Sequence, residues 1–486
     1  MTVLHAPRRT AVLLALLGML ALLAAPGALA HESTPTGVTR LELDLGARQL
    51  SLTITAPPEG QGRMPVVVLP RGEAPPGEVQ LAAVRPGAAP TDAVAVPVAP
   101  VGQPHEVVLA TDGPGAWEIT VADGTTVARV PIVLAAPAPT PGWVWAVRVG
   151  ALVGVVALVV ALTPSVRQRP RAAVTLGVVA LVGVTVAATA IATAPATPTT
   201  PTPAAAQAPV PAPPAGGHAG HGGGTTAATP TTVPGMTTTS GSVVATARTA
   251  TPAVAGAPTD LELDLTDSST GAVVDDLAVH DDALIHLAVI GPGGTLDHLH
   301  PVRTGPGHYV VRLTPGAAGR YGVFAEMERA GDGGHQVART AIDVTGPATP
   351  AAPAPGPGVR EVAGMQVDVA VPDAVAGRPT TITATFGSGG RQVTDLQGWL
   401  GMAGHLMLLG PGLDGTPDPV DPASAFGHVH DMGPAGPSGT YGPRITFEHT
   451  FPSPGRHQLW VQVQRDWQIV TVPVTVDVAP GSAPTP

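Results

Sequence analysis

Short runs in which apolar and polar residues alternate cover much of the chain, and turn-forming residues separate them. The segment 31–135 contains such runs at 40–45, 50–55, 66–69 and 117–121. Successive side chains of a strand point to opposite faces of a sheet, so this pattern predicts strands with one buried face. No run has a helical period. We therefore expect a β-sandwich in this segment.

Two further strand-rich segments follow, at 259–345 and 360–480, and a Pro/Ala linker at 346–358 separates them. The first of them opens with Leu-Glu-Leu-Asp-Leu at 261–265, which repeats the five residues at 41–45. The second ends in long alternating runs that are typical of the last strands of a Greek-key sandwich. The sequence predicts a mainly β protein with three immunoglobulin-like β-sandwich domains.

Two longer apolar runs, at 143–162 and 172–193, differ from the predicted strands. A helix that crosses a membrane needs about 20 apolar residues. The loop between the runs, at 163–171, holds three arginines and no acidic residue. Positively charged loops favour the cytoplasmic side. We therefore expect a two-helix transmembrane hairpin at 143–193, with the bulk of the chain on the extracytoplasmic side of a bacterial cell membrane.

The segments that flank this hairpin carry different signals. Residues 1–30 indicate a secretory signal peptide, with two arginines, an apolar stretch and an Ala-Leu-Ala cleavage site. Cleavage there would leave His31 at the new N-terminus, where its amine and imidazole could bind copper together. Residues 194–258 are rich in Pro, Thr, Ala and Gly. This composition predicts a disordered tether.

Composition and motifs exclude several classes of function. The net charge is −11, and nucleic-acid binding needs a basic surface, so we expect no nucleic-acid partner. The chain has no cysteine, and a metal site would have to use His, Met or carboxylate ligands. Nucleophile elbows, H-E-x-x-H motifs and phosphate loops are absent from the sequence, and we expect no enzyme.

Each of the last two strand-rich segments contains a histidine that is followed by a His-x-His pair. Residues i and i+2 of a strand lie on the same face, so such a pair can bind one ion and the earlier histidine can complete a set of three. We expect one metal site in each segment, as tandem sites of a duplicated domain. The two predicted triads are His286, His298 and His300, and His405, His428 and His430.

Methionines near the second triad bear on which metal the site would bind. Met407 and Met432 have the same strand parity as His405 and His430. Thioether sulfur favours Cu(I), while imidazole also binds Cu(II) and zinc. A site with His and Met but without Cys favours copper over structural zinc, which usually takes thiolates. We therefore expect copper, with zinc as the alternative.

The alternative hypothesis is a non-catalytic envelope module for interaction or structure, in which the histidines are incidental. Single histidines and methionines in strands are commonly core residues. The two hypotheses differ in one respect that a structure can test. Metal binding requires the imidazole nitrogens of each triad to converge on a common point.

Several runs resemble a group of bacterial extracytoplasmic β-sandwich domains known as YtkA-like or heavy-metal-associated. The runs are LQGWLGMAGHLMLL at 396–409, GHVH at 427–430 and FPSPGRHQLWVQVQ at 451–464, with HDDALIHL and HLHP in the preceding segment. A Pro/Asp-rich insertion at 411–425 departs from the pattern of this group. The resemblance implies metal binding outside the cytoplasm. Together with the predicted spans and triads, it leads us to expect a membrane-anchored protein that binds or buffers copper, with the cytoplasmic membrane, a metal ion and an envelope protein as partners.

Overall fold

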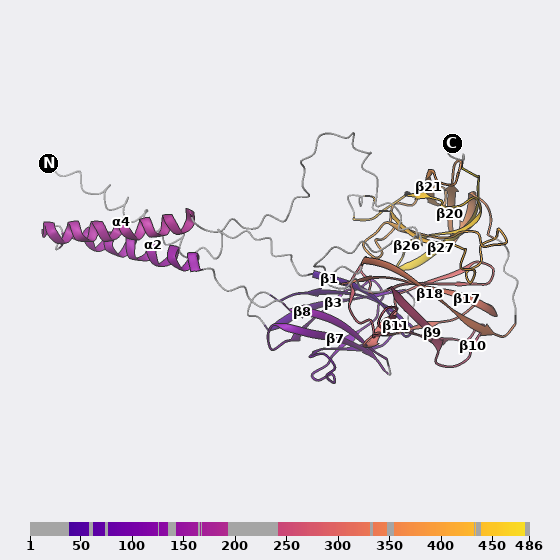
Figure 1. The fold of residues 1–486 in the computed structure, drawn as a ribbon, viewed down its shortest axis with the longest axis horizontal. Helices are drawn as coiled ribbons and strands as arrows, with labels where there is room; N and C mark the ends of the chain where they lie inside the picture. Colours follow the sequence, from indigo (N-terminus) through magenta and orange to yellow (C-terminus); the bar gives the residue numbers. More distant parts are fainter. Residues whose placement is uncertain are drawn as a thin grey trace. The chain divides into compact units, whose positions relative to one another are not determined.

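Three two-sheet β-sandwiches and two helices make up the described part of the chain (Figure 1). The sandwiches lie in one compact unit and the helices in another. The prediction of a mainly β fold built from sandwiches is thus confirmed. The computed structural model describes residues 38–57, 62–72, 76–124, 126–134, 142–163, 166, 168–192, 242–330, 334–347, 354–431, 433 and 439–481.

The first sandwich consists of two four-stranded antiparallel sheets. Alternate residues of most of its strands are buried, as the alternation of apolar and polar residues predicts. One sheet has the order β1 (Val38–Leu45), β2 (Arg48–Thr55), β3 (Arg63–Arg71) and β6 (His105–Ala110). The other has the order β5 (Val94–Pro97), β4 (Glu78–Val84), β7 (Gly115–Asp123) and β8 (Thr126–Leu134).

The second sandwich pairs a four-stranded with a six-stranded sheet. The smaller sheet has the order β15 (Val302–Gly305), β16 (His308–Leu313), β11 (Thr259–Asp267) and β9 (Val243–Thr249). The larger has the order β10 (Ala253–Val254), β18 (Gly334–Thr345), β17 (Gly319–Arg329), β13 (His286–Gly291) and β14 (Thr295–Leu299), with β12 (Leu277–Ala278) on β17.

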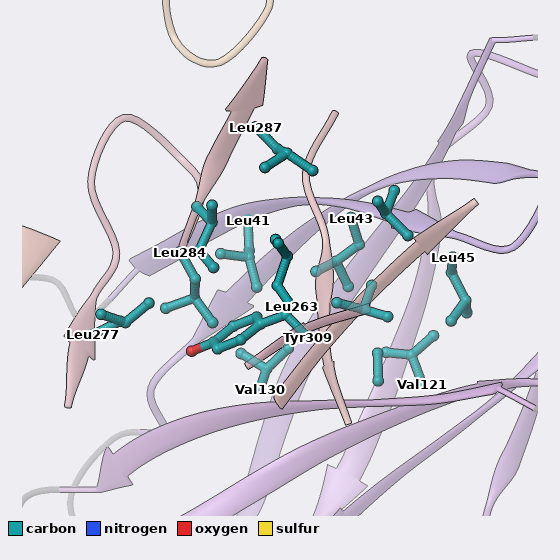
Figure 2. Close-up of a cluster of buried hydrophobic side chains, with 14 of the residues drawn as sticks. Leu41, Leu43, Leu45, Val121, Val130, Leu263, Leu277, Leu284, Leu287 and Tyr309 are labelled. Carbon is teal, nitrogen blue, oxygen red and sulfur yellow. The ribbon is translucent and has the colours of Figure 1, made fainter. Parts of the chain in front are cut away.

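One hydrophobic cluster fills both the first and the second sandwich. Figure 2 shows Leu41 and Leu43 of β1 beside Leu263 and Tyr309 of the second sandwich. All four side chains are buried. The repeated Leu-Glu-Leu-Asp-Leu run therefore supplies buried leucines to the same core from both sandwiches.

The third sandwich has a core of its own. Its strands are antiparallel, as in the first sandwich. One sheet has the order β19 (Gly358–Val362), β20 (Met365–Ala370), β21 (Pro379–Ser388) and β22 (Arg391–Gln392), with β25 (Arg444–Thr450) on β21. The other has the order β24 (Phe426–Asp431), β23 (Gly404–Leu409), β26 (Gly455–Arg465) and β27 (Gln468–Val478).

Strands β13 and β23 are buried on both faces. One face of each strand lines the core of its own sandwich. The opposite faces meet in a separate apolar cluster, which consists of Ala288, Ile290, Phe324, Met407, Leu409 and Trp460. His286 opens β13 with the parity of Ala288, and His405 lies in β23 with the parity of Met407. The contact between the two sheets therefore brings the first histidines of both triads to the same interface.

The two predicted helices are present as α2 (Gly142–Ala161) and α4 (Pro170–Ala192). Among the described residues, however, no helix is long and apolar enough to cross a membrane. The predicted transmembrane hairpin was therefore wrong. Its small residues serve helix packing instead: a Cβ atom on Gly183 would lie 2.7 Å from the Gly150 carbonyl oxygen and 2.9 Å from Gly154 Cα. The sequence prediction had counted such residues as part of an apolar span.

The predicted tether also needs a correction at its C-terminal end. Strands β9 and β10 lie within the range 194–258 that composition assigned to a disordered segment. The end of the predicted tether forms a strand because β9 pairs residue by residue with β11. Its Ala, Thr and Val side chains can alternate between the two faces of a sheet edge. The predicted signal peptide, His31, Met432 and residues 193–241 lie outside the described residues.

Candidate metal centre

The first predicted triad converges in the second sandwich. One ligand nitrogen from each of His286, His298 and His300 lies within 4.8 Å of the others. All three side chains are buried. His298 pairs with Ala288 across β14 and β13, and His300 follows two residues later on the same face. The strand register thus explains the convergence that the His-x-His spacing predicted.

Each histidine of this triad has one nitrogen in contact with an outer partner and one that is free. His286 Nε2 is 3.1 Å from the His280 carbonyl oxygen, and His298 Nδ1 is 3.0 Å from Gln462 Oε1. His300 Nδ1 is 3.6 Å from Asp44 Oδ2. The opposite nitrogens, His286 Nδ1, His298 Nε2 and His300 Nε2, are buried and have no hydrogen-bond partner within the described parts of the chain.

The second predicted triad converges in the third sandwich. His428 Nε2 is 3.2 Å from His405 Nδ1 and 3.1 Å from His430 Nε2. A tetrahedral metal with bonds of about 2.0–2.1 Å to nitrogen places its ligand atoms roughly 3.3 Å apart. The nitrogens of this triad therefore have the spacing that one bound ion requires.

The outer partners of the second triad repeat those of the first. His405 Nε2 lies 3.2 Å from the Trp399 carbonyl oxygen, six residues earlier, just as His286 contacts the carbonyl of His280. His428 Nδ1 donates to Glu326 Oε2 at 2.7 Å, and His430 Nδ1 is 3.4 Å from Asp281 Oδ2. Each triad thus presents one Nδ1 and two Nε2 atoms. The duplicated pattern in the sequence corresponds to a duplicated arrangement of atoms.

Hydrogen bonds to outer acceptors orient four of the rings, those of His286, His298, His405 and His428. A ring that donates its N–H to an outer acceptor keeps a lone pair on the opposite nitrogen, which is the form that binds a metal. Three lone pairs that face one another repel unless a cation or a proton lies between them. The arrangement is therefore chemically suited to a cation, and it fits the neutral imidazole sites of transition metals.

The two triads are in contact with each other, which corrects the prediction of two separate tandem sites. The ring centroids of His298 and His428 are 5.2 Å apart, and those of His298 and His405 are 5.6 Å apart. The Trp399 ring lies against both triads, with centroids 4.9 Å from His298 and 4.7 Å from His405. Six imidazoles and one indole therefore form a single aromatic cluster between the second and third sandwiches.

Comparisons with known proteins give no function for this cluster. A family described as a domain of unknown function, DUF8832, matches residues 360–480, which form the third sandwich. No curated protein matches the chain.

Three solved structures are similar to this chain at low identity. FdeC, an Escherichia coli adhesin, has 12% identity and a TM-score of 0.15, covering 87% of this chain and 94% of its own. The fibronectin(III)-like modules of Clostridium thermocellum CbhA have 16% identity and a TM-score of 0.13, and the match covers 49% of this chain and 95% of theirs. A DUF4785 family protein of Legionella pneumophila has 12% identity and a TM-score of 0.16, and the match covers 48% of this chain and 55% of its own. Scores this low carry no argument, and the assignment of three sandwiches rests on the strands of this chain.

Burial favours the neutral form of five of the six imidazoles in the cluster. It lowers the pKa of His286 to about 4 and that of His430 to about 3, and the neighbouring His428 acts in the same direction. The pKa values of His298, His300 and His405 are also held well below the usual range, mainly by burial. Neutral imidazole is the form that ligates a metal, so the cluster is ready for a cation near pH 7.

Glu326 is the charged group nearest to the second triad. Burial acts to raise its pKa, but His428 and a hydrogen bond from His335 outweigh this effect and hold the pKa of Glu326 well below its usual range. Its carboxylate accepts hydrogen bonds from His428 and His335 at 2.7 and 2.5 Å. The negative charge therefore lies directly behind a candidate ligand, where it favours a cation on the other side of the ring.

The predicted sulfur ligand Met407 lies in the apolar layer. It is fully buried with Phe324 and Trp460, and it pairs with His428 across β23 and β24. Strand parity placed it correctly on the face of His405, but the apolar sheet contact takes up this part of the face. Met432 is not among the described residues.

Sequence reasoning missed the outer partners Asp44, Asp281, Glu326 and Gln462. All four lie far along the chain from the histidine they contact. The separations are 256 residues for Asp44, 102 for Glu326, 164 for Gln462 and 149 for Asp281 with His430. No local spacing rule reaches that far.

The buried titratable groups predict how stability depends on pH. A histidine whose pKa is lower in the folded than in the unfolded chain binds fewer protons when folded, so its contribution to stability is lost as pH falls below about 6.5. Carboxyl groups with raised pKa values act in the opposite direction over the same range. The lowered histidines are His286, His298, His300, His405, His430, His449 and His457. The raised carboxyls are Glu42, Asp44, Asp282 and Asp297.

Because the histidines outnumber these carboxyls, we expect the free energy of unfolding of the metal-free chain to fall as pH decreases from about 6.5 to 4.5. Urea unfolding at a series of pH values measures this slope. The His286→Gln variant should have a shallower slope than the wild type, whereas His308→Gln, outside the cluster, should not. A stability that is constant or increases on acidification would contradict the assignment of neutral buried imidazoles.

Proposed function

We propose that this protein binds transition-metal ions, copper in the first place, at the two histidine triads. The observation that carries the proposal is the inward orientation of one nitrogen from each of six histidines, five of them buried, with an outer acceptor near the opposite nitrogen of each ring. Ligand histidines of metal sites almost always have such outer partners. A histidine with only a structural role does not need the nitrogen of another histidine to face its own lone pair.

The donor atoms favour a particular group of metals. The two triads offer imidazole nitrogens, which suit copper, zinc, nickel and iron. Among divalent ions, copper binds such donors most tightly. Copper is therefore the proposed ion and zinc the alternative, and this choice no longer depends on methionine sulfur.

The coordination number favours binding and exchange over a closed structural site. Each triad supplies three protein ligands, while structural zinc sites usually supply four. His430 retains 16% of its side-chain exposure and lies beside the carboxylate of Asp281, which is 23% exposed. This side of the second triad offers a path for an ion to enter and leave, as a metal buffer or carrier requires.

The sequence signals agree with a role outside the cytoplasm. The predicted signal peptide at 1–30 would export the chain, and the resemblance to YtkA-like, heavy-metal-associated domains points to the same compartment. A site built from histidine has no thiolate ligands that an oxidising compartment could convert to disulfides. We therefore propose binding or buffering of copper outside the cytoplasm.

The stoichiometry of binding tests the proposal. We expect the metal-free full chain to bind two Cu(II) ions in equilibrium dialysis, with metal measured by mass spectrometry. His298→Ala and His428→Ala should each reduce binding to about one ion, and the double variant should bind none, because one ligand of each triad is lost.

The control for these variants is His308→Ala. His308 bonds to Asp264 outside the cluster, so this variant should retain both ions. Circular dichroism checks that every variant is folded. Full copper binding by a folded double variant would refute the proposed ligands.

The carboxylate behind His428 gives a second test. Loss of an outer partner typically lowers metal affinity by about 10–100-fold. We expect Glu326→Gln to weaken one of the two copper sites by that factor in competition with a chromophoric chelator. Glu361→Gln removes an exposed carboxylate of the third sandwich and should leave both affinities unchanged. Equal affinities for the two variants would show that Glu326 has no part in the site.

A further inference from the structure

The contact between the two triads has a consequence for the ions they would hold. His298 of the first triad lies against both His405 and His428 of the second, with ring centroids 5.6 and 5.2 Å apart. His286 is likewise 5.5 Å from His428. Rings in contact at these distances leave no room for an intervening layer of protein, so the ions of the two triads would be direct neighbours.

The charges around the cluster do not balance two divalent ions. An imidazole that binds a metal is neutral, so two Cu(II) ions bring four positive charges into a site in which five of the six rings are buried. Among the described residues, the carboxylates in contact with the six rings are those of Asp44, Asp281 and Glu326, which supply at most three negative charges. A buried charge without compensation is strongly unfavourable. One further anion is needed in the oxidised form.

Each ion also has an open coordination position. Three protein nitrogens leave at least one position of a four-coordinate ion for an external ligand. A small anion between the two ions would fill a position on both and supply the missing charge. Two Cu(I) ions bring only two positive charges, which the carboxylates already balance, so the reduced form has no such need.

We propose that the two triads form one dinuclear copper centre, in which two Cu(II) ions share a small bridging anion such as hydroxide or azide. This inference rests on the proposed function, because it requires that both triads bind copper. It adds that the two ions act as a pair and that an exogenous anion is a ligand of the oxidised centre.

Electron paramagnetic resonance of the full chain during a Cu(II) titration tests the pairing. Bound copper is measured separately by mass spectrometry. An anion that bridges two Cu(II) ions couples their spins, so we expect the spin signal to increase up to one bound ion and then to decrease. At two bound ions, the integrated signal should fall below half of the bound copper. Addition of azide should produce a new charge-transfer absorption in the oxidised protein, and none in the reduced protein.

Single-triad variants provide the matched comparison. His300→Ala and His430→Ala should each bind one copper with a full, uncoupled signal, whereas His308→Ala should behave as the wild type. If a triad variant does not fold, the spin count of the wild type still decides.

Two bound ions with a full signal from isolated spins would overturn the dinuclear centre. A single bound ion would overturn it as well, while the proposed copper binding would stand. No bound copper at all would refute the proposed function together with this inference.

Discussion

The interface between the second and third sandwiches depends on one unusual constraint: six imidazoles lie there with one nitrogen of each turned inward, and all of them except His430 are buried. Burial lowers the pKa values of five of them, and outer acceptors fix the orientation of their rings. In the second triad, nitrogens 3.1 and 3.2 Å apart face one another. Such an arrangement is electrostatically costly by itself, and a cation at its centre converts it into a favourable one.

The scaffold explains how this arrangement is held. Strands β13 and β23 pack across an apolar layer, and the first histidine of each triad lies where that layer ends. The outer partners cross between sandwiches: Glu326 of the second supports His428 of the third, and Gln462 of the third supports His298 of the second. Asp44 brings in the first sandwich through His300. The orientation of the candidate ligands therefore depends on how the three sandwiches pack against one another.

Alternation of apolar residues was sufficient to predict the three sandwiches, and the His-x-His spacing was sufficient to predict both triads. Both signals are local, because the strand repeats every two residues. The union of the triads into one cluster was not predictable in this way, since it follows from the packing of β13 against β23. Met407 illustrates the same limit: parity gave its face, but Trp460 and Phe324 decided its neighbours. The apolar runs at 143–193 predicted helices correctly and a membrane span wrongly. Composition alone does not distinguish residues that pack one helix against another from residues of a membrane span.

X-ray absorption at the copper edge of the loaded full chain identifies the atoms bound to the ion, and it therefore decides whether the six histidines are the ligands. We expect a first shell dominated by nitrogen at about 2.0 Å, with the outer-shell scattering of about three imidazoles per copper and no sulfur. A shell that contains sulfur, or one without imidazole scattering, would contradict the assignment of the six histidines as the ligands.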